Sequence, residues 1–416
     1  MLSQNTINIV KSTVPVLEVH GEAITKRFYE MMFNNHPELL NIFNHANQKQ
    51  GRQQKALANT VYAAAKYIDN LEAIVPVVTQ IAHKHRSLGI QAEHYPIVGK
   101  HLILAIKDVL KDAATEEIIS AWEEAYGVIA EVFINVEADM YQQTEQLEGG
   151  WKGFRRFIVD RMVKENNVIT SFYLKPEDGG KIATYEPGQY ISIQLKIPGE
   201  KYTHIRQYSL SDSPNRDYYR ISVKEESGNG EKPDGIVSNY LHNHVKEGEI
   251  LNVSAPAGEF VLDTSKQSPI VLLSGGVGIT PMISMLNAIS ENNPDRETTF
   301  IHAAINGEFH AMKEHVQSIA SKHDNIRSFV VYERPTEKDV EDCSFDKSGF
   351  INLEWLMSIL LSNQADFYFC GPVPFMKAIY HALKTWEVPD ENIHYEFFGP
   401  AGSLEEQEKE PAVSEV

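Results

Sequence analysis

The hydrophobic pattern of the chain changes twice, and these changes divide it into three parts. Residues 1–147 contain few glycines and space their apolar residues three and four apart, which predicts successive helices that end near Gly149-Gly150. From Phe154 onward, short alternating runs such as 189–195 are separated by Asp-Gly-Gly and Pro-Gly turns, which predicts a small antiparallel barrel. After about residue 265, apolar strands alternate with helices, the pattern of a doubly wound parallel sheet.

We therefore expect a multidomain protein: an all-α domain, an antiparallel β-barrel and an α/β doubly wound domain. The expected boundaries are 1–147, 151–264 and 265–403, with an acidic solvated tail at 404–416 that carries no chemistry. A chain of 416 residues with 42% hydrophobic content is too long for one core. Its formal charge of −19 disfavours nucleic acid and anionic membranes, so we expect small-molecule partners and a monomer.

Cysteine usage and the N-terminus bear on the compartment. The two cysteines, Cys343 and Cys370, are too few for a disulfide framework or for the four thiolates of an iron–sulfur cluster. The segment 1–5 lacks a signal pattern, and no uncharged apolar run reaches the roughly 18 residues of a membrane span. We expect a cytoplasmic protein without a membrane span.

The barrel segment contains two motifs that suit a flavin nucleotide. The first combines a guanidinium for a phosphate, an aromatic ring for stacking and a hydroxyl within reach of a flavin ring nitrogen. The second is a glycine before a helix start, where backbone N–H groups could bind a pyrophosphate. The candidate residues are Arg206, Gln207, Tyr208, Ser209, Gly235, Val237 and Ser238. The alternative is that Arg206 is a surface charge and Tyr208 packs within a strand.

Two further motifs follow in the α/β segment. A glycine-rich stretch comes after an apolar strand and opens a helix, so its amides can face a dinucleotide pyrophosphate, although it is not G-x-G-x-x-G and could be purely architectural. A Cys-Gly-Pro sequence ends a second strand. The candidates are Ser274, Gly275, Gly276, Val277, Gly278, Ile279, Thr280, Cys370, Gly371 and Pro372. The order of these motifs indicates a hydride donor and a flavin, so the acceptor of the electrons is expected in residues 1–147.

One histidine of the helical part is a candidate metal ligand. His85 follows the apolar stripe of its helix, whereas His83 points away from it. Glu137 continues another apolar stripe and would bury a carboxylate unless a partner compensates it, directly or through a hydroxyl such as that of Tyr95. The alternatives are that His85 is an ordinary core residue, that Glu137 lies at the edge of the stripe in water, and that Tyr95 is ordinary packing.

Residues 1–147 resemble the bacterial globins. The resemblance runs through Phe28-Tyr29, Pro37, Phe43, Gln53, Leu57 and His85 in that order. It implies that His85 is the proximal iron ligand in a relay with Tyr95 and Glu137, and that Phe43 wedges against the haem face. The resemblance also implies a distal pocket that contains Tyr29, Gln53 and Leu57.

The rest of the chain resembles the ferredoxin-reductase-like flavoproteins, and the three parts together resemble the flavohaemoglobins. This resemblance makes Tyr190 another flavin contact and places Cys370-Gly371-Pro372 beside the nicotinamide. It also implies that the final strand, residues 392–400, closes over the flavin. Its candidates are Glu396 and Phe398, with Phe397 where the family usually has a smaller residue. Lys84 would pair with a haem propionate or with Glu396; the alternative is a solvated lysine.

The resemblance implies one haem b per chain, FAD and NAD(P)H, and a nitric oxide dioxygenase that converts NO and O2 to nitrate. A nicotinamide delivers two electrons as hydride whereas a haem iron accepts one at a time, so a flavin is needed between them. Tyr29 would donate to the bound oxygen. Two alternatives remain: a haem-based gas sensor or oxygen store, against which the fused reductase argues, and a haem-free flavin reductase.

Overall fold

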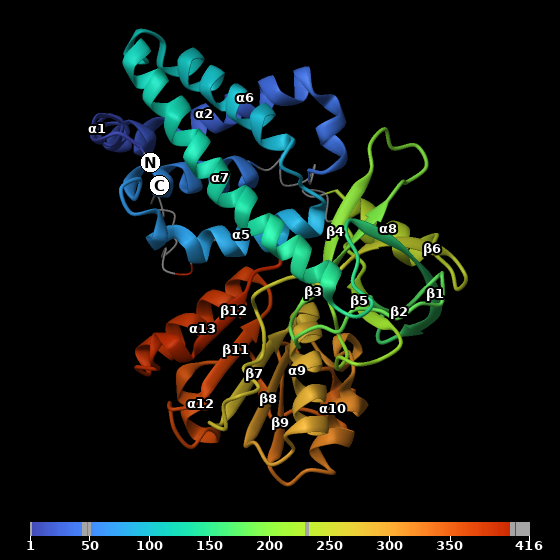
Figure 1. Ribbon diagram of the computed structural model, residues 1–416. Helices are drawn as coiled ribbons and strands as arrows, with labels where there is room; N and C mark the ends of the chain where they lie inside the picture. The colour runs from blue at the N-terminus through green and yellow to red at the C-terminus, as the bar shows by residue number, and fades with distance from the viewer. Residues whose placement is uncertain (1, 44–47, 49–50, 229–232, 400–403, 405–416) are drawn as a thin grey trace, which may run out of the picture.

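The computed structural model describes residues 2–43, 48, 51–228, 233–399 and 404 of the chain, and these form three parts in sequence order (Figure 1). The first part is entirely helical, the second is an antiparallel sheet that curls into a barrel, and the third is a parallel sheet between helices. No helix among the described residues is long and apolar enough to cross a membrane.

The helical part packs its long helices around a core that includes Phe28, Met32 and Trp122. The hydroxyls of Ser3 and Thr115 cap the first and last helices by accepting from backbone N–H groups of the first turn. The elements are α1 (Gln4–Ser12), α2 (Val14–Asn35), η1 (Pro37–Asn41), α4 (Arg52–Lys66), η2 (Leu71–Ile74), α5 (Val75–Leu88), α6 (His94–Leu110), η3 (Lys111–Ala113) and α7 (Glu116–Gln146).

The barrel is a six-stranded sheet in the order β4-β3-β6-β1-β2-β5, with antiparallel neighbours. A bridge between Leu210 and Ile221 joins the chain just after β4 to β5 and so brings the two edges together. The elements are β1 (Phe154–Lys164), β2 (Ile169–Pro176), β3 (Tyr190–Leu195), β4 (His204–Ser209), β5 (Tyr219–Lys224), α8 (Ile236–Asn243) and β6 (Ile250–Ser254).

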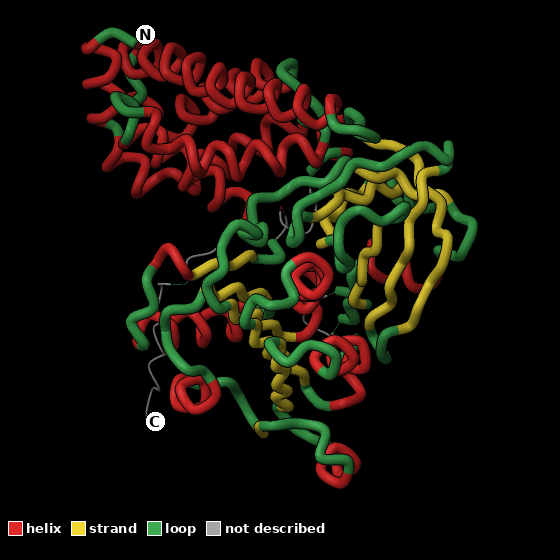
Figure 2. Tube along the Cα trace, turned by 60° about the horizontal axis from the view of Figure 1, so that its bottom comes forward, coloured by secondary structure: helices red, strands yellow, loops and turns green. Residues whose placement is uncertain are grey.

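The third part is a parallel sheet in the order β10-β9-β8-β7-β11-β12. Helices α9 and α10 cover one face, and α12 and α13 cover the other (Figure 2). Its strands are β7 (Ile270–Gly275), β8 (Thr298–Ala304), β9 (Ile326–Tyr332), β10 (Lys347–Ser348), β11 (Asp366–Cys370) and β12 (Ile393–Glu396). Its helices are η4 (Gly276–Gly278), α9 (Ile279–Asn292), η5 (Gly307–Phe309), α10 (Lys313–Ala320), α11 (Glu337–Glu341), α12 (Leu353–Ile359), α13 (Val373–Thr385) and η6 (Asp390–Asn392).

The order of the parallel strands determines where a ligand can bind. From β7 the chain adds β8, β9 and β10 on one side, and then crosses to add β11 and β12 on the other. In open parallel sheets the crevice for a ligand lies at the carboxyl ends of the strands where this reversal occurs, here β7 and β11. Those two ends carry the glycine-rich stretch and the Cys-Gly-Pro sequence.

Two sequence expectations about the C-terminal segment are wrong in part. The final strand was expected over residues 392–400, but β12 ends at Glu396, where its pairing with β11 stops at Cys370. Residue Leu404, assigned to a solvated tail, is 2% exposed and packs in the core between the sheet, α12 and α13, because its apolar side chain finds an apolar surface there. Residues 405–416 lie outside the described part of the chain.

Candidate functional site

The predicted partnership of His85 with Glu137 is present. Nδ1 of His85, on α5, lies 2.7 Å from Oε1 of Glu137, on α7, and 3.3 Å from the hydroxyl of Tyr95. That hydroxyl donates to the same carboxylate oxygen over 2.5 Å. Glu137 is 3% exposed, so the alternative that places it in water is wrong. Burial and the neighbouring carboxylate raise the pKa of Tyr95, which therefore keeps the proton that it donates.

This arrangement suits a metal-ligating histidine. A carboxylate at Nδ1 favours the tautomer that carries its proton there, which leaves the lone pair of Nε2 available to a metal. Nε2 of His85 makes no hydrogen bond to any described residue, and the side chain is 31% exposed. The donor set therefore fits a haem iron. His83, predicted to point away from the helical core, points at the barrel, where its Nδ1 accepts from the N–H of Gly258.

The predicted distal residues gather around Tyr29 on α2. Its ring stacks on Phe33, with ring centroids 5.6 Å apart, and meets Phe43 edge-on at 5.8 Å. Its hydroxyl interacts with the side chains of Gln53 and Gln48, and Nε2 of Gln48 donates to Oε1 of Gln53 over 2.9 Å. Burial raises the pKa of Tyr29, so the phenol stays neutral and remains a proton donor.

Two further features complete this pocket. Leu57 lies one turn after Gln53 on α4 and packs at the edge of the same apolar cluster. Gln48 is absent from the sequence prediction, since nothing in its local pattern distinguishes it from the other polar residues between Phe43 and Gln53. Residues 44–47 and 49–50 lie outside the described part of the chain.

The first flavin motif occupies β4. Ser209 stands opposite Tyr190 in the antiparallel register with β3, and Gln207 donates to the hydroxyl of Ser192 over 3.2 Å. Arg206 donates to the carbonyl of Ile205 and makes no ion pair with a described carboxylate. A partly buried guanidinium without a counter-charge fits a phosphate ligand.

The structure corrects one detail of the second flavin motif. The N–H of Gly235, which was expected to face a pyrophosphate, instead donates to the carbonyl of Glu226 over 2.8 Å, because that segment crosses the start of α8. The hydroxyl of Ser238 is also engaged, with the backbone of Gly235 and Glu226. Val237 is 2% exposed and packs in the barrel core. The N–H groups of the first helical turn remain the donors that this site can offer.

The two motifs of the parallel sheet meet at the predicted crevice. A Cβ atom on Gly278 would lie 2.2 Å from the carbonyl oxygen of Cys370, and one on Gly371 would lie 2.6 Å from the ring of Phe375. Gly276 has a φ of +54°, in the left-handed region that favours glycine. These glycines therefore permit the two strand ends to touch and leave a surface of backbone that suits a dinucleotide.

The remaining residues of these motifs are mostly buried. Ile279 and Thr280 are buried at the start of α9, and Val277 packs partly buried beside them. The hydroxyl of Ser274 lies 2.8 Å from Nδ1 of His302, a contact that the sequence did not reveal. Cys370 is fully buried, and burial raises the pKa of its thiol well above the usual value.

Lys84 on α5 and Glu396 at the end of β12 influence each other through their opposite charges. Burial raises the pKa of Glu396 to about 8, and the positive charge of Lys84 opposes this rise only in part. Burial also lowers the pKa of Lys84, and the negative charge of Glu396 opposes that change. Lys84 is partly buried, so the alternative of a freely solvated lysine is wrong. Phe397 packs partly buried with its ring 5.8 Å from that of Tyr395, and Phe398 is 48% exposed.

Helix α5 also binds the barrel directly. Arg86 is 7% exposed and donates from Nη2 to the carbonyl of Pro256 over 2.5 Å. Ser87 lies within hydrogen-bonding reach of the hydroxyl of Tyr190, whose ring lies 3.1 Å from the position of a Cβ on Gly258. The residues after the proposed iron ligand therefore contact a proposed flavin residue. Sequence reasoning missed Arg86, Ser87 and Gly258.

Three family models match successive parts of the chain. Residues 26–133 match the globin family, residues 157–262 the oxidoreductase FAD-binding domain, and residues 272–381 the oxidoreductase NAD-binding domain. The crystal structure of a flavohemoglobin from Malassezia yamatoensis with bound FAD and heme superposes with a TM-score of 0.83 at 26% identity, and covers 96% of this chain and 100% of that one. These matches confirm the expected fold class and the expected haem, FAD and nicotinamide nucleotide.

Curated relatives match over nearly the full chain. A flavohemoprotein of Bacillus thuringiensis subsp. konkukian is 62% identical over 405 residues, 97% of this chain and 100% of that relative. A flavohemoprotein of Bacillus subtilis is 53% identical over 404 residues, 97% of this chain and 99% of the relative. The FAD/NAD-binding domain of a nitric oxide dioxygenase from Vibrio cholerae is 36% identical with a TM-score of 0.54, and covers 59% of this chain and 99% of that one. The chain belongs to the flavohemoprotein family.

Proposed function

We propose that this flavohemoprotein is an NAD(P)H-dependent nitric oxide dioxygenase, which converts NO and O2 to nitrate. The observation that carries the proposal is the direct contact of α5 with the barrel. Arg86, the residue after His85, donates a hydrogen bond to the carbonyl of Pro256. A reductase and a globin pocket that share an interface are suited to continuous electron delivery. The similarity to the reductase part of the Vibrio cholerae nitric oxide dioxygenase supports the same reaction.

The cofactors supply the electron chemistry when they are bound: hydride from the nicotinamide, its division into single electrons at FAD, and an oxygen-binding iron in haem b. The residues of the chain hold and orient them. Nε2 of His85 is the nitrogen placed to ligate the iron. Glu137 and Tyr95 keep the ring in one orientation and increase its basicity, because the carboxylate accepts at Nδ1.

Tyr29 is a neutral donor that is buried among apolar side chains. Tyr29 keeps its proton because burial raises its pKa, and Gln53 with Gln48 orients its hydroxyl. Phe43 and Leu57 pack partly buried against the same apolar cluster. With haem bound, a buried phenol of this kind would serve as a hydrogen-bond donor to a ligand that carries partial negative charge.

In the reductase, we assign the flavin to the strand β4, to Tyr190 and to the start of α8. The assigned residues are Arg206, Gln207, Tyr208, Ser209, Gly235, Val237 and Ser238. The nucleotide is assigned to 274–280 and 370–372, with Glu396, Phe397 and Phe398 in the segment that closes over the flavin. Lys84 opposes Glu396 at the junction with the helical part. Domain boundaries at 147, 151, 264 and 403 are part of this proposal.

The setting of the enzyme completes the proposal. Both cysteines are free thiols, which suits a reducing cytoplasm. A formal charge of −19 repels the phosphates of nucleic acid, so the partners are O2, NO and NAD(P)H, and the chain acts as a monomer.

The test is consumption of NO in air by the purified protein that contains haem and FAD. NO should disappear at a rate that depends on NAD(P)H, with nitrate as the product and about one electron used per NO. The control is the same mixture without O2, in which nitrate should not form. A protein that consumes NAD(P)H equally with and without NO and forms no nitrate would contradict the proposal. A flavoprotein without a Soret band would instead support the haem-free reductase.

A further inference from the structure

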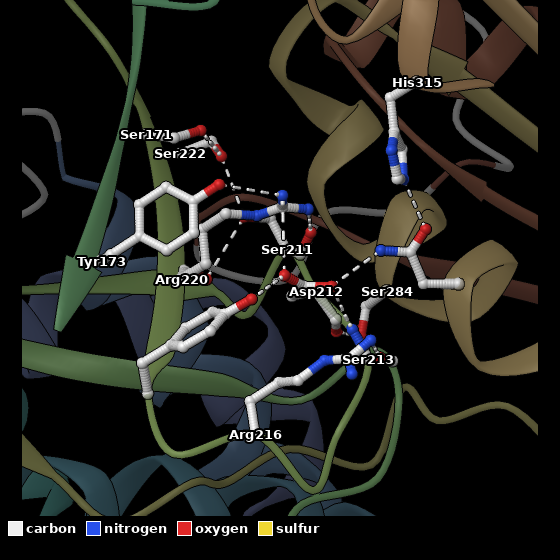
Figure 3. Close-up of polar contacts among 12 residues, drawn as sticks. Ser171, Tyr173, Ser211, Asp212, Ser213, Arg216, Arg220, Ser222, Ser284 and His315 are labelled. Atoms are coloured by element: carbon white, nitrogen blue, oxygen red, sulfur yellow. Dashed lines mark hydrogen bonds and ion pairs between the residues drawn. The ribbon is translucent and has the colours of Figure 1, made fainter. Parts of the chain in front are cut away.

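The loop that follows β4 is joined to α9 by buried polar contacts between the barrel and the parallel-sheet domain (Figure 3). The backbone carbonyl of Asp212 accepts from the hydroxyl of Ser284 over 2.6 Å. Its carboxylate Oδ1 accepts from Nδ2 of Asn287 over 2.8 Å. The exposed fractions are 7% for Asp212, 0% for Ser284 and 4% for Asn287. A buried polar contact of this kind is costly to break, because water does not replace it.

One face of α9 makes all of these contacts. Ser284, Asn287 and Glu291 are three and four residues apart, so their side chains project from the same side of the helix. Glu291 accepts from the hydroxyl of Ser213 over 2.8 Å and also pairs with Arg216 at the solvent-exposed rim. The face of α9 is thus directed at a single loop of the barrel.

The barrel holds Asp212 rigidly in place. Its carboxylate accepts from the N–H of Ser213 and from the hydroxyl of Tyr218, each over 2.8 Å, and lies 3.6 Å from Nη1 of Arg220. Burial works against ionisation, but Arg220 and these hydrogen bonds hold the pKa of Asp212 below its usual value. Residues of the barrel therefore keep this carboxylate ionised and oriented toward α9.

The parallel-sheet domain orients the opposite partner in the same way. Oδ1 of Asn287 lies 2.7 Å from Nε2 of His315, on α10, so the amide presents its NH2 group to Asp212 (Figure 3). The hydroxyl of Tyr185 adds a second donor to the carbonyl of Asp212, over 2.6 Å. A continuous series of hydrogen bonds thus runs from the barrel through Asp212 and Asn287 to α10.

The position of this network relative to the two cofactor motifs gives it significance. Asp212 is three residues after Ser209, the end of the proposed flavin motif on β4. Ser284 is four residues, about one helical turn, after Thr280, at the end of the glycine-rich stretch where α9 begins. The network therefore fastens the strand proposed to present the flavin to the helix proposed to present the nucleotide.

We propose that Asp212, Ser284 and Asn287 are positioning residues that set the distance between the nicotinamide and the flavin for hydride transfer. The inference rests on the proposed function of the two motifs. In the step concerned, the C–H bond of the dihydronicotinamide breaks, its two electrons and proton form an N–H bond on the flavin, and the nicotinamide leaves oxidised. A misplacement of about 1 Å in such a step costs roughly a hundredfold in rate.

The experiment is anaerobic stopped-flow reduction of the flavin in the holoenzyme by NADH and by NADH deuterated at the transferred position. Asn287→Ala is the main variant, and Ser284→Ala, which removes one hydroxyl, is the milder second variant. We expect Asn287→Ala to lower the rate constant at saturating NADH by about tenfold or more, while the half-saturating concentration changes less. The isotope effect should grow and become dependent on temperature. Hydrogen exchange should quicken in the loop 211–216 and in α9.

Ser268→Ala is the matched control. It removes a hydrogen bond to the buried Asp366, so both partners lie within the parallel-sheet domain. Ser268→Ala should lower the melting temperature, but its rate constant of flavin reduction and its isotope effect should equal those of the wild type. If Asn287→Ala and Ser284→Ala quicken exchange but keep the wild-type rate constant and isotope effect, the positioning role is wrong. If neither NADH nor NADPH reduces the flavin of the wild-type protein, the proposed function is wrong, and the positioning role is wrong with it.

Discussion

Nδ1 of His85 lies 2.7 Å from Oε1 of Glu137, and this contact joins α5 to α7 at the point where the iron ligand is proposed. Both residues were placed on buried helix faces by periodicity alone. A buried carboxylate requires a partner, and the structure supplies an imidazole and the hydroxyl of Tyr95. The pair therefore determines which imidazole nitrogen remains free.

Replacing His85 with alanine tests whether its Nε2 ligates the haem iron. We expect His85→Ala to lose or scramble the Soret band, because it removes the imidazole nitrogen that is placed to ligate the iron, while the flavin absorbance stays unchanged. The measurement is the visible spectrum, with haem content determined by extraction. Normal haem content and an unaltered spectrum would remove His85 from the proposed site.

Replacing Tyr29 with phenylalanine tests the distal donor. A hydrogen bond to an acceptor that carries charge contributes about 1.5–3 kcal/mol, so Tyr29→Phe should speed O2 dissociation by roughly ten- to 150-fold. The ring contacts with Phe33 and Phe43 remain in the variant, so the pocket should keep its shape. Flash photolysis of the oxygen complex gives the rate, and an unaltered rate would contradict the assigned role.

Replacing Arg206 with alanine separates the flavin from the haem. Arg206 has no carboxylate partner among the described residues, and its loss should leave a phosphate of FAD without a cation. We expect Arg206→Ala to retain haem, to contain little FAD and to lose haem reduction by NAD(P)H. Glu177 pairs with Arg156 at the barrel surface, so Arg156→Ala is a control that should keep its FAD. Full flavin retention in Arg206→Ala would show that the strand motif was misread.

Much of the site could be predicted because it depends on local pattern. Helical periodicity places His85 and Glu137 on buried faces, and a strand followed by glycines and a helix identifies residues 274–280. The fold class follows from the same periodicities. Resemblance to a family added Tyr29, Gln53 and Tyr190, which no local pattern distinguishes.

The contacts between domains could not be predicted in this way. Asp212 lies in a Ser-Asp-Ser-Pro segment that is typical of a turn, and its partner Asn287 is 75 residues away in another domain. The N–H of Gly235 was assigned to a ligand because the crossing segment at Glu226 cannot be seen from the sequence. Nothing in the sequence around Arg86 indicates that the barrel buries it.

A buried histidine of the parallel-sheet domain predicts sensitivity to acid. Burial lowers the pKa of His302 to about 3, whereas an unfolded histidine has a pKa of about 6.5. Below about pH 6.5 the unfolded chain therefore binds a proton at this histidine, whereas the folded chain does not. The free energy of unfolding therefore falls as the pH falls toward 3. Near pH 4.5, two units below the unfolded pKa, this linkage costs roughly 3 kcal/mol.

The test compares the wild type with His302→Gln in thermal unfolding between pH 7 and pH 4.5. The variant should have a lower melting temperature than the wild type at pH 7, because it disturbs the contact with Ser274. This difference in melting temperature should become smaller as the pH falls. Titrating groups that do not interact with His302 cancel in the difference, whereas His310 does not, because the charge of His302 helps to lower its pKa. A gap that stays constant over this range would contradict the shifted pKa.

The last prediction concerns the contact between α5 and the barrel. Arg86 donates to the carbonyl of Pro256 from a position between His85 and the proposed flavin residue Tyr190, and its Nε has no partner among the described residues. Hydrogen bonds from charged groups contribute about 1.5–3 kcal/mol, so Arg86→Met should loosen the helical part from the barrel.

Arg86→Met should therefore slow the transfer of electrons from flavin to haem and leave the reduction of flavin by NADH unchanged, because Arg86 takes no part in the Asp212 network. Stopped-flow spectra resolve the two steps at flavin and Soret wavelengths. Asn287→Ala should show the opposite pattern, with slow flavin reduction followed by normal transfer to haem. The two variants thus act as controls for one another, and a slowing of both steps by Arg86→Met would mean that the whole protein, rather than this junction, had been disturbed.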